Sequence, residues 1–296
     1  MAAATLRYGS LPGVVPLRCP ALAEELLEAY LARLGVRRPS EPSLEVLTEL
    51  LAAQLSRVCY ENIDVKLGKP VPELRPEAAV RRVAVRSRGG YCFIVVEAFA
   101  ALLCSLGFEV SLHPGVVAAD PPPAEKWGDH VVLMVHLDGT RFVADCGLGE
   151  GPRKPFKLAS SVWEEDGFTF ALEEREGGTW RFHNPANLTG TMPGFSVDIS
   201  TSVADVSEFE AFHRFYWTDE TSGYVRGPVV ALILAPEAGG GLLSMHGCVL
   251  RRSHPEIRSA DDSQCYEVVA TASCAEEWFA LLRGTFFMPL DDLSEE

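Results

Sequence analysis

The sequence lacks an apolar run long enough to cross a membrane, since its longest one, from Phe93 to Cys104, is interrupted by Glu97. A membrane-spanning helix needs about 20 predominantly apolar residues. Basic residues are also scarce, because 26 lysines and arginines stand against 41 acidic residues and the net charge is −15. A nucleic-acid-binding protein normally presents a basic face. We therefore expect neither a membrane nor a nucleic acid as a partner.

Cysteine spacings typical of disulfide scaffolds and zinc sites are missing as well. The eight cysteines are scattered over 296 residues, and none forms a C-x-x-C pair. Small secreted domains are dense in cysteine, and structural zinc sites hold their ligands at short, regular spacings. The sequence therefore predicts reduced cysteines, a cytoplasmic protein and no bound metal.

The pattern of apolar residues changes along the chain. Helical spacing occurs in the N-terminal part and predicts helices over 21–34, 43–58, 76–85 and 93–106. Short strand-like runs begin after Phe108. The last part combines strands at 229–234, 242–250 and 266–270 with a closing helix at 273–282. We predict an α+β protein with a helical part at 1–107, a mostly β part at 108–220 and a smaller α/β part at 221–296.

Cys92 is the best candidate for a nucleophile. It follows the segment Arg88-Gly89-Gly90-Tyr91 and begins a predicted helix that is apolar nearly all round. A cysteine pKa falls at a helix N-terminus or beside a protonated histidine. Helix-end amides can also stabilise an oxyanion, and glycines let the backbone approach a substrate closely. We expect Cys92 to be a reactive thiol with a lowered pKa.

A histidine and an aspartate flank a predicted hairpin. Asp138-Gly139 is typical of a two-residue turn, and this turn would place His130 opposite Gly147. His130 and Asp145 then become diagonal neighbours on one face, about 7–8 Å apart at the backbone and within reach of each other. A carboxylate so placed fixes the imidazole tautomer and stabilises the imidazolium. The pattern predicts Cys92 as nucleophile, His130 as base and then acid, and Asp145 as the orienting group.

These residues lie in segments that resemble one known family, the arylamine N-acetyltransferases. The resemblance is strongest in RGGYCF at 88–93, DHVVL at 129–133 and FVADCGLG at 142–149. It continues in YENIDV at 60–65, GKP at 68–70 and KPFKL at 154–158, and it extends over about residues 22–290.

The resemblance implies a fold and a reaction. The fold would comprise an N-terminal helical domain at 1–107, a central β-barrel at 108–220 and a C-terminal α/β lid at 221–296, around a cysteine triad core like that of papain and the transglutaminases. Acetyl-CoA would be a co-substrate, with no permanently bound cofactor. A ping-pong reaction would move its acetyl group to Cys92 and then to the nitrogen of an arylamine or arylhydrazine.

The resemblance also assigns binding residues. Leu148 stands where the family has a phenylalanine that lines the acceptor pocket, and Phe93 is a second expected substrate contact. Trp127 and Gly128, in the loop before His130, are expected to lie near CoA.

Departures from the family pattern leave alternatives open. Ile94 and Val96 are apolar where the family has Glu or Gln and then Asn, and Cys59 replaces a proline. A cysteine hydrolase or an amide-forming acyltransferase with another acyl donor remains an alternative. A non-catalytic relative that keeps the fold as a binding module is a third. The sequence does not define the oligomeric state.

Overall fold

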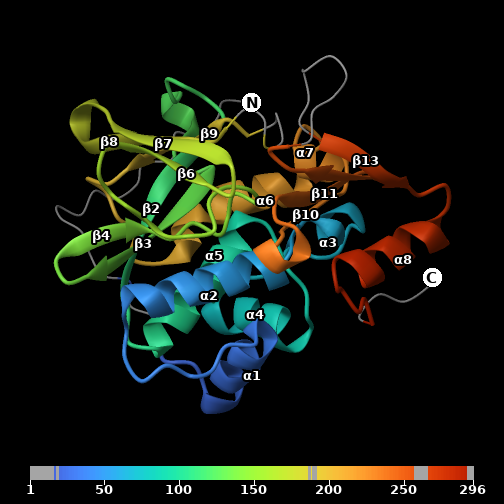
Figure 1. Cartoon of the computed structure of the whole chain (residues 1–296), viewed down its shortest axis with the longest axis horizontal. Coiled ribbons are helices and arrows are strands. Elements are labelled where there is room, and N and C mark those ends of the chain that lie inside the picture. Colours follow the sequence, from blue (N-terminus) through green and yellow to red (C-terminus); the bar gives the residue numbers. More distant parts are fainter. Residues whose placement is uncertain (1–16, 18–19, 186–187, 189–191, 257–265, 292–296) are drawn as a thin grey trace.

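The N-terminal part of the computed structural model is helical, as the apolar spacing predicts (Figure 1). The structure describes residues 17, 20–185, 188, 192–256 and 266–291. Ser43 caps the second helix by accepting a hydrogen bond from Val46 N at 3.2 Å. The predicted helix at 76–85 is an α-helical segment followed by a π-helical turn, Arg81–Val85. The helices are α1 (Glu24–Leu34), α2 (Leu44–Arg57), α3 (Ile63–Lys66), α4 (Pro76–Val80) and α5 (Cys92–Ser105).

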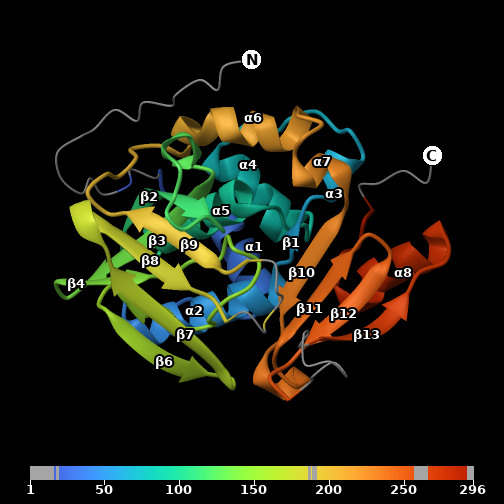
Figure 2. The same ribbon diagram turned by 90° about the horizontal axis from the view of Figure 1, so that it is seen from above.

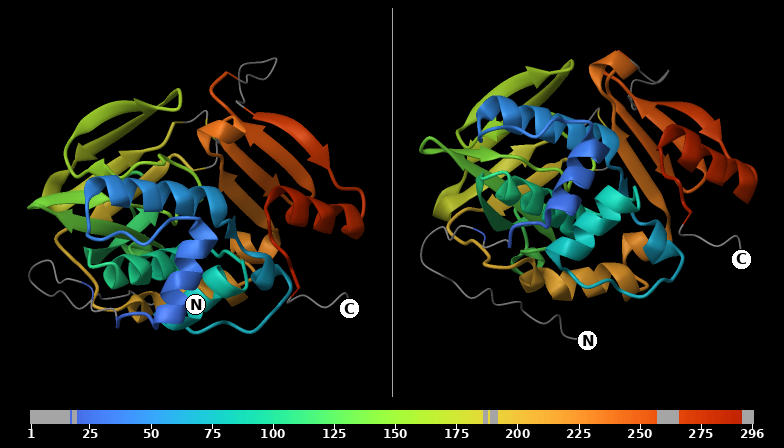
Figure 3. Two further views of the ribbon diagram at one scale, coloured as in Figure 1. Left: turned by 60° about the horizontal axis from the view of Figure 1, so that its bottom comes forward. Right: turned by 90° about the horizontal axis from the view of Figure 1, so that it is seen from below.

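Helix α5 forms the centre of the molecule. Its residues from Cys92 to Leu103 are all buried, because a helix that is apolar on every side is stable only when it is covered on every side. It packs between the other helices and the strands β2 and β3, and α1 and α2 lie on the outside of this layer (Figures 2 and 3). In the described part of the chain, no helix is both long and apolar enough to cross a membrane.

Eight antiparallel strands form a curled sheet in the order β5-β4-β3-β2-β9-β8-β7-β6 (Figure 2). The hairpin at Asp138-Gly139 has the predicted register, with Leu137 opposite Thr140 and Met134 opposite Val143. The ladder ends at Val143, however, so the expected pairing of His130 with Gly147 does not form. The strands are β2 (Glu109–Val117), β3 (His130–Leu137), β4 (Thr140–Val143), β5 (Phe156–Lys157), β6 (Ser161–Glu165), β7 (Phe168–Glu174), β8 (Thr179–His183) and β9 (Gly194–Asp198).

A second antiparallel sheet has five strands in the order β1-β10-β11-β12-β13. The prediction of one strand over 242–250 is wrong, because Gly247 takes a positive φ of 60° and turns the chain between two strands. The strands are β1 (Tyr60–Glu61), β10 (Val229–Ile233), β11 (Leu242–His246), β12 (Val249–Ser253) and β13 (Tyr266–Thr271), and α8 (Ala275–Thr285) is the closing helix. Strand β1 comes from the helical part of the chain and therefore joins it to the C-terminal sheet.

Two further helices, α6 (Glu210–Thr218) and α7 (Gly223–Arg226), precede β10 and were not expected from the sequence. Asn62, beside β1, holds α7 in place. Its Nδ2 donates to the carbonyls of Tyr224 and Gly227 at 2.8 Å each, and its Oδ1 accepts from Val229 N at 2.7 Å. The N-terminal part of the chain thus fixes the position of a helix far along the sequence.

Candidate active site

Cys92 is the first residue of α5 and lies at a meeting point of helices and sheet. Its thiol lies within electrostatic range of His130 and of the Phe93 backbone amide, and both act to lower its pKa. Cys92 is 2% exposed and His130 is 1% exposed. The predicted nucleophile and base are therefore within interaction range of each other, and both are shielded from bulk water.

His130 and Asp145 also meet, although Asp145 lies beyond the end of β4. His130 donates from Nε2 to Asp145 Oδ2 at 2.8 Å. The other carboxylate oxygen accepts from Gly147 N at 2.6 Å, so the loop itself orients the carboxylate. Because Nε2 is engaged, Nδ1 is the nitrogen left for the Cys92 thiol. The three side chains thus stand in the order nucleophile (Cys92), base (His130) and orienting group (Asp145).

The pKa of His130 is set by its carboxylate partner. Burial lowers this pKa, but the charge of Asp145 and its hydrogen bond outweigh burial and raise the pKa to about 10. A buried imidazolium is stable here because a carboxylate compensates its charge. His130 therefore holds the proton that Cys92 gives up, so the pair can form a thiolate and an imidazolium.

The expected lowering of the Cys92 pKa is not found. Burial raises the pKa of this thiol above its usual value, although the hydrogen bond and charge of His130 and the Phe93 amide act against that rise. Loss of hydration disfavours a thiolate in an apolar site more than the helix end favours it. The reactive anion thus depends on protonated His130, and Cys92 is not activated by its helix position alone.

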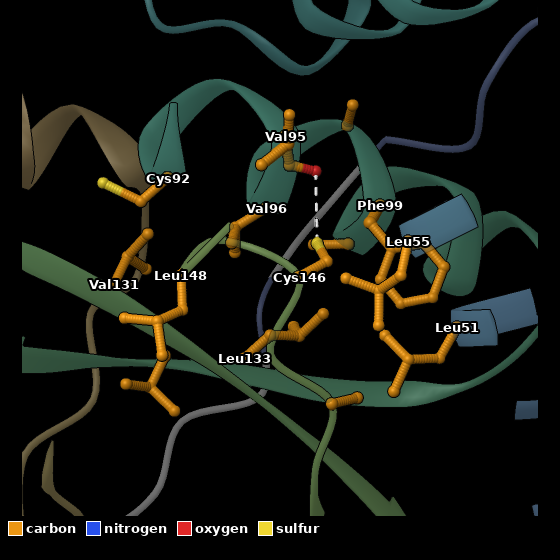
Figure 4. Packing of buried hydrophobic residues seen from close by; sticks show 14 of the residues in the cluster. Leu51, Leu55, Cys92, Val95, Val96, Phe99, Val131, Leu133, Cys146 and Leu148 are labelled. Atoms are coloured by element: carbon orange, nitrogen blue, oxygen red, sulfur yellow. Dashed lines mark hydrogen bonds between the residues drawn. The ribbon is translucent and has the colours of Figure 1, made fainter. Parts of the chain in front are cut away.

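Gly147 lets the loop that carries Asp145 cross directly over Cys92. A Cβ at this position would lie 3.0 Å from Cys92 Cβ and 2.7 Å from Val96 Cγ2. The neighbouring Cys146 thiol donates to the Val95 carbonyl at 3.7 Å and ties the loop to α5 (Figure 4). The loop is therefore supported by the packing of Val96 and by this thiol contact. The family pattern has a polar side chain at the position of Val96.

The glycine pair before Cys92 serves packing inside the protein. A Cβ on Gly89 would lie 1.7 Å from the Cys59 carbonyl oxygen, and a Cβ on Gly90 would lie 2.7 Å from Ile94 Cβ. Gly90 also forms a parallel bridge with Tyr60. These glycines therefore allow close packing of Cys59 and Ile94 against the backbone. We had expected them to allow the close approach of a substrate.

A buried network of charges braces the segment that leads to Cys92. Arg88 is fully buried and contacts Glu61 and Asp64 at 3.1 Å each. Arg82 contacts Glu61 at 2.6 Å, pairs with Asp64 and donates to the Gly89 carbonyl. Burial raises the pKa of Asp64, but the two arginines outweigh burial and lower it to about 2. The structural role of both arginines escaped the sequence analysis.

Of the two expected substrate contacts, Leu148 lines a hollow and Phe93 is packed inside the protein. Leu148 lines a narrow hollow together with Asp145, Phe182 and Phe195. Phe93 is fully buried, and its ring stacks against other aromatic rings of the protein, with centroid distances of 5.3 Å to Phe209 and 6.0 Å to Tyr216.

The loop before His130 approaches the sheet. Gly128 takes a positive φ of 92° and donates from N to the Gly115 carbonyl at 2.9 Å, while Trp127 is half-buried. Asp129 accepts from Val117 N at 3.0 Å and is buried, and burial raises the pKa of its carboxyl to about 6. In the ranges that the structure describes, no group of three or more metal-ligating side chains is assembled.

The fold is that of an acetyltransferase family. The chain matches the protein-family model described as N-acetyltransferase over residues 43–291 and belongs to this family. Human arylamine N-acetyltransferase 1 is 32% identical over 159 residues, covering 52% of this chain and 54% of the relative. The Macaca mulatta arylamine N-acetyltransferase 2 is 31% identical over 219 residues, covering 67% of this chain and 74% of the relative. The matched region thus spans about half the length of the human relative.

Solved structures confirm the mixed α+β fold. The arylamine N-acetyltransferase from Salmonella typhimurium superposes with a TM-score of 0.77 at 22% identity, covering 93% of this chain and 95% of that one. The enzyme from Mycobacterium smegmatis gives 0.76 at 26% identity, covering 91% and 94%. The Mycobacterium marinum enzyme in complex with CoA gives 0.77 at 23% identity, covering 91% and 95%. The family resemblance noted in the sequence is therefore confirmed.

Proposed function

We propose that this protein is an arylamine N-acetyltransferase that uses acetyl-CoA as co-substrate and an arylamine or arylhydrazine as acceptor. The contact that carries the proposal is the 2.8 Å hydrogen bond between His130 and Asp145 beside the Cys92 thiol. The relatives named as arylamine N-acetyltransferases and the CoA complex of one of them support the same substrates.

The reaction follows from the order of the three side chains. The Cys92 thiolate adds to the acetyl carbonyl of acetyl-CoA, and protonated His130 gives its proton to the departing CoA sulfur. The acceptor nitrogen then adds to the thioester, and neutral His130 takes the proton that this nitrogen loses. Asp145 stabilises the imidazolium at both stages, as in other triads. Cys92 leaves as the thiolate, and His130 is again protonated.

We assign Leu148 and Phe93 to the acceptor side, and Trp127 and Gly128 to the CoA side. The hollow beside Asp145 supports the first part of this assignment, because Leu148 forms one of its walls. A leucine in place of an aromatic ring leaves the acceptor without one stacking partner, so we expect acceptor choice to depend on the remaining walls.

We also propose the domain organisation of the family, with a helical domain at 1–107, a β-barrel at 108–220, an α/β lid at 221–296 and a triad core like that of papain. The curled eight-stranded sheet and the separate five-stranded sheet support this division. A cytoplasmic location is part of the proposal. Its support is that the six described cysteines are free, while Cys19 and Cys265 lie outside the described residues.

Intact mass measurement tests the proposal. We expect incubation with acetyl-CoA to add one acetyl group, which a later addition of an arylamine removes. Cys92→Ala should abolish the adduct, whereas Cys104→Ala, on the same helix, should retain it. An unmodified wild-type protein, or an adduct that persists in Cys92→Ala, would show that the proposal is wrong.

A further inference from the structure

Two tyrosine hydroxyls lie next to each other beside the site. Tyr60, on β1, and Tyr224, on α7, are joined by a hydrogen bond between their hydroxyls. The Tyr224 ring stacks on Tyr91 at 5.2 Å between centroids and meets the edge of Tyr216 at 5.0 Å. Asn62 fixes the Tyr224 backbone through its carbonyl. Both hydroxyls are therefore held in place by rigid surroundings.

One proton of this pair is left without an acceptor. Each phenol has a single O–H, and a hydrogen bond between two phenols uses only one of the two protons. Within the described part of the chain, no other acceptor contacts either hydroxyl. By contrast, Tyr91 donates to His213 Nδ1 at 2.5 Å and Tyr216 donates to the Asp129 carbonyl at 2.8 Å. Tyr60 is buried and Tyr224 is half-buried, and a phenol proton without a partner in such surroundings indicates a position for a ligand acceptor.

Both tyrosines contact the segment that leads to the nucleophile, because Tyr224 stacks on Tyr91 directly before Cys92. Tyr60 bridges to Gly90, which precedes Cys92 closely in the chain. Its ring also packs on the loop over Cys92, because a Cβ on Gly149 would lie 2.9 Å from Tyr60 Cγ. Burial raises the pKa of both phenols, and the charge of Cys92 raises it further, which places the sulfur within electrostatic range of both hydroxyls.

We propose that the Tyr60–Tyr224 hydroxyl pair donates a hydrogen bond to the carbonyl oxygen of the acyl group that Cys92 carries. This inference rests on the proposed function. The carbonyl oxygen becomes negative when the thiolate adds, and again when the acceptor amine adds. The hydroxyl proton stays on the phenol throughout, and the bonds formed and broken are those of the acyl transfer. A donor that is already fixed beside the buried sulfur stabilises this charge without reorganising.

Tyrosine-to-phenylalanine variants test the pair, because they remove only hydroxyl groups. Tyr60→Phe, Tyr224→Phe and the double variant should be compared with Tyr30→Phe, which removes another buried hydroxyl, one bonded to Gln54 at 2.9 Å. In each single variant the remaining hydroxyl keeps a proton, so we expect a partial loss. In the double variant we expect acylation by p-nitrophenyl acetate and by acetyl-CoA to slow about 100-fold.

Alkylation of Cys92 by iodoacetamide separates this role from a structural one. Alkylation needs the thiolate but forms no oxyanion, so its rate should stay within about twofold in the double variant. Equal acylation rates in the double variant and the wild type would overturn the inference. A parallel loss of acylation and alkylation would also overturn it, since the pair would then act on the thiolate or on the fold. A wild-type protein that neither reagent acylates would instead refute the proposed function itself.

Discussion

Glu97 gives the sharpest prediction about stability. It lies on α5, is 3% exposed, and its Oε1 has no hydrogen-bond partner in the part of the chain that the structure describes. Burial raises the pKa of this carboxyl to about 9, and the nearby charge of Asp205 adds to the rise. Glu97 is therefore protonated in the folded protein at neutral pH. This protonation lowers the free energy of unfolding by an amount that can be calculated.

The cost follows from the unfolded chain. There the carboxyl releases its proton near pH 4.5, and each pH unit above that value is worth about 1.4 kcal/mol. Keeping Glu97 protonated at pH 7 therefore costs about 3 kcal/mol. Because the pKa is raised on folding, the unfolded state binds fewer protons between about pH 4.5 and 9. Stability should accordingly fall as the pH rises through this window.

Urea unfolding of the wild type and of Glu97→Gln at pH 5.5 and pH 7.5 tests this reasoning. A neutral amide needs no proton, so the gain in unfolding free energy on substitution should be larger at pH 7.5 by about 2.7 kcal/mol. Glu49→Gln, at an exposed position on α2, is the control and should shift neither value. Parallel pH dependences for the wild type and Glu97→Gln would refute the claim that the folded protein holds this proton.

Three further predictions concern the site and its support. Asp145→Asn should lower the pKa of His130 and slow Cys92 acylation by about 10³- to 10⁴-fold, measured in single-turnover experiments; a loss below tenfold would contradict the assigned role. Gly147→Ala should destabilise the fold by about 1–3 kcal/mol and reduce acylation, because its Cβ meets Val96 at 2.7 Å; unchanged thermal unfolding and acylation would contradict this. Arg88→Ala should cost about 3–5 kcal/mol in urea unfolding, since it leaves two buried carboxylates short of a cation; a cost below 1 kcal/mol would show that other groups already compensate them.

The features predictable from the sequence were those encoded by nearby residues. The apolar run after Cys92 defined α5, and the Asp138-Gly139 turn gave the correct hairpin register. The residues of the candidate triad could be chosen because a helix start and one hairpin bring them together. Even so, Asp145 reaches His130 from a loop and not from the expected strand, because β4 ends at Val143.

The features that escaped prediction depend on contacts between distant segments. Strand β1 is too short to show a period, and it exists because Tyr60 and Glu61 pair with β10. Helix α6 buries His213 and Trp217, but loop-like segments on either side obscured it in the sequence. Tyr224 gave no signal in the sequence because its role depends on Tyr60, which lies far from it along the chain.

The apolar residues on α5 and the polar groups around it form one arrangement. Ile94 packs against Gly90 and Val96 packs against Gly147, so α5 offers no polar side chain beside the sulfur at these positions. Hydroxyl groups instead come from Tyr60 and Tyr224, which the N-terminal part and the C-terminal part contribute separately. Because Asn62 fixes α7 from the N-terminal side, any movement between the two parts would also move the hydroxyl pair relative to Cys92. Acylation in this protein should therefore depend on the contact between β1 and α7 as well as on the three residues of the proposed triad.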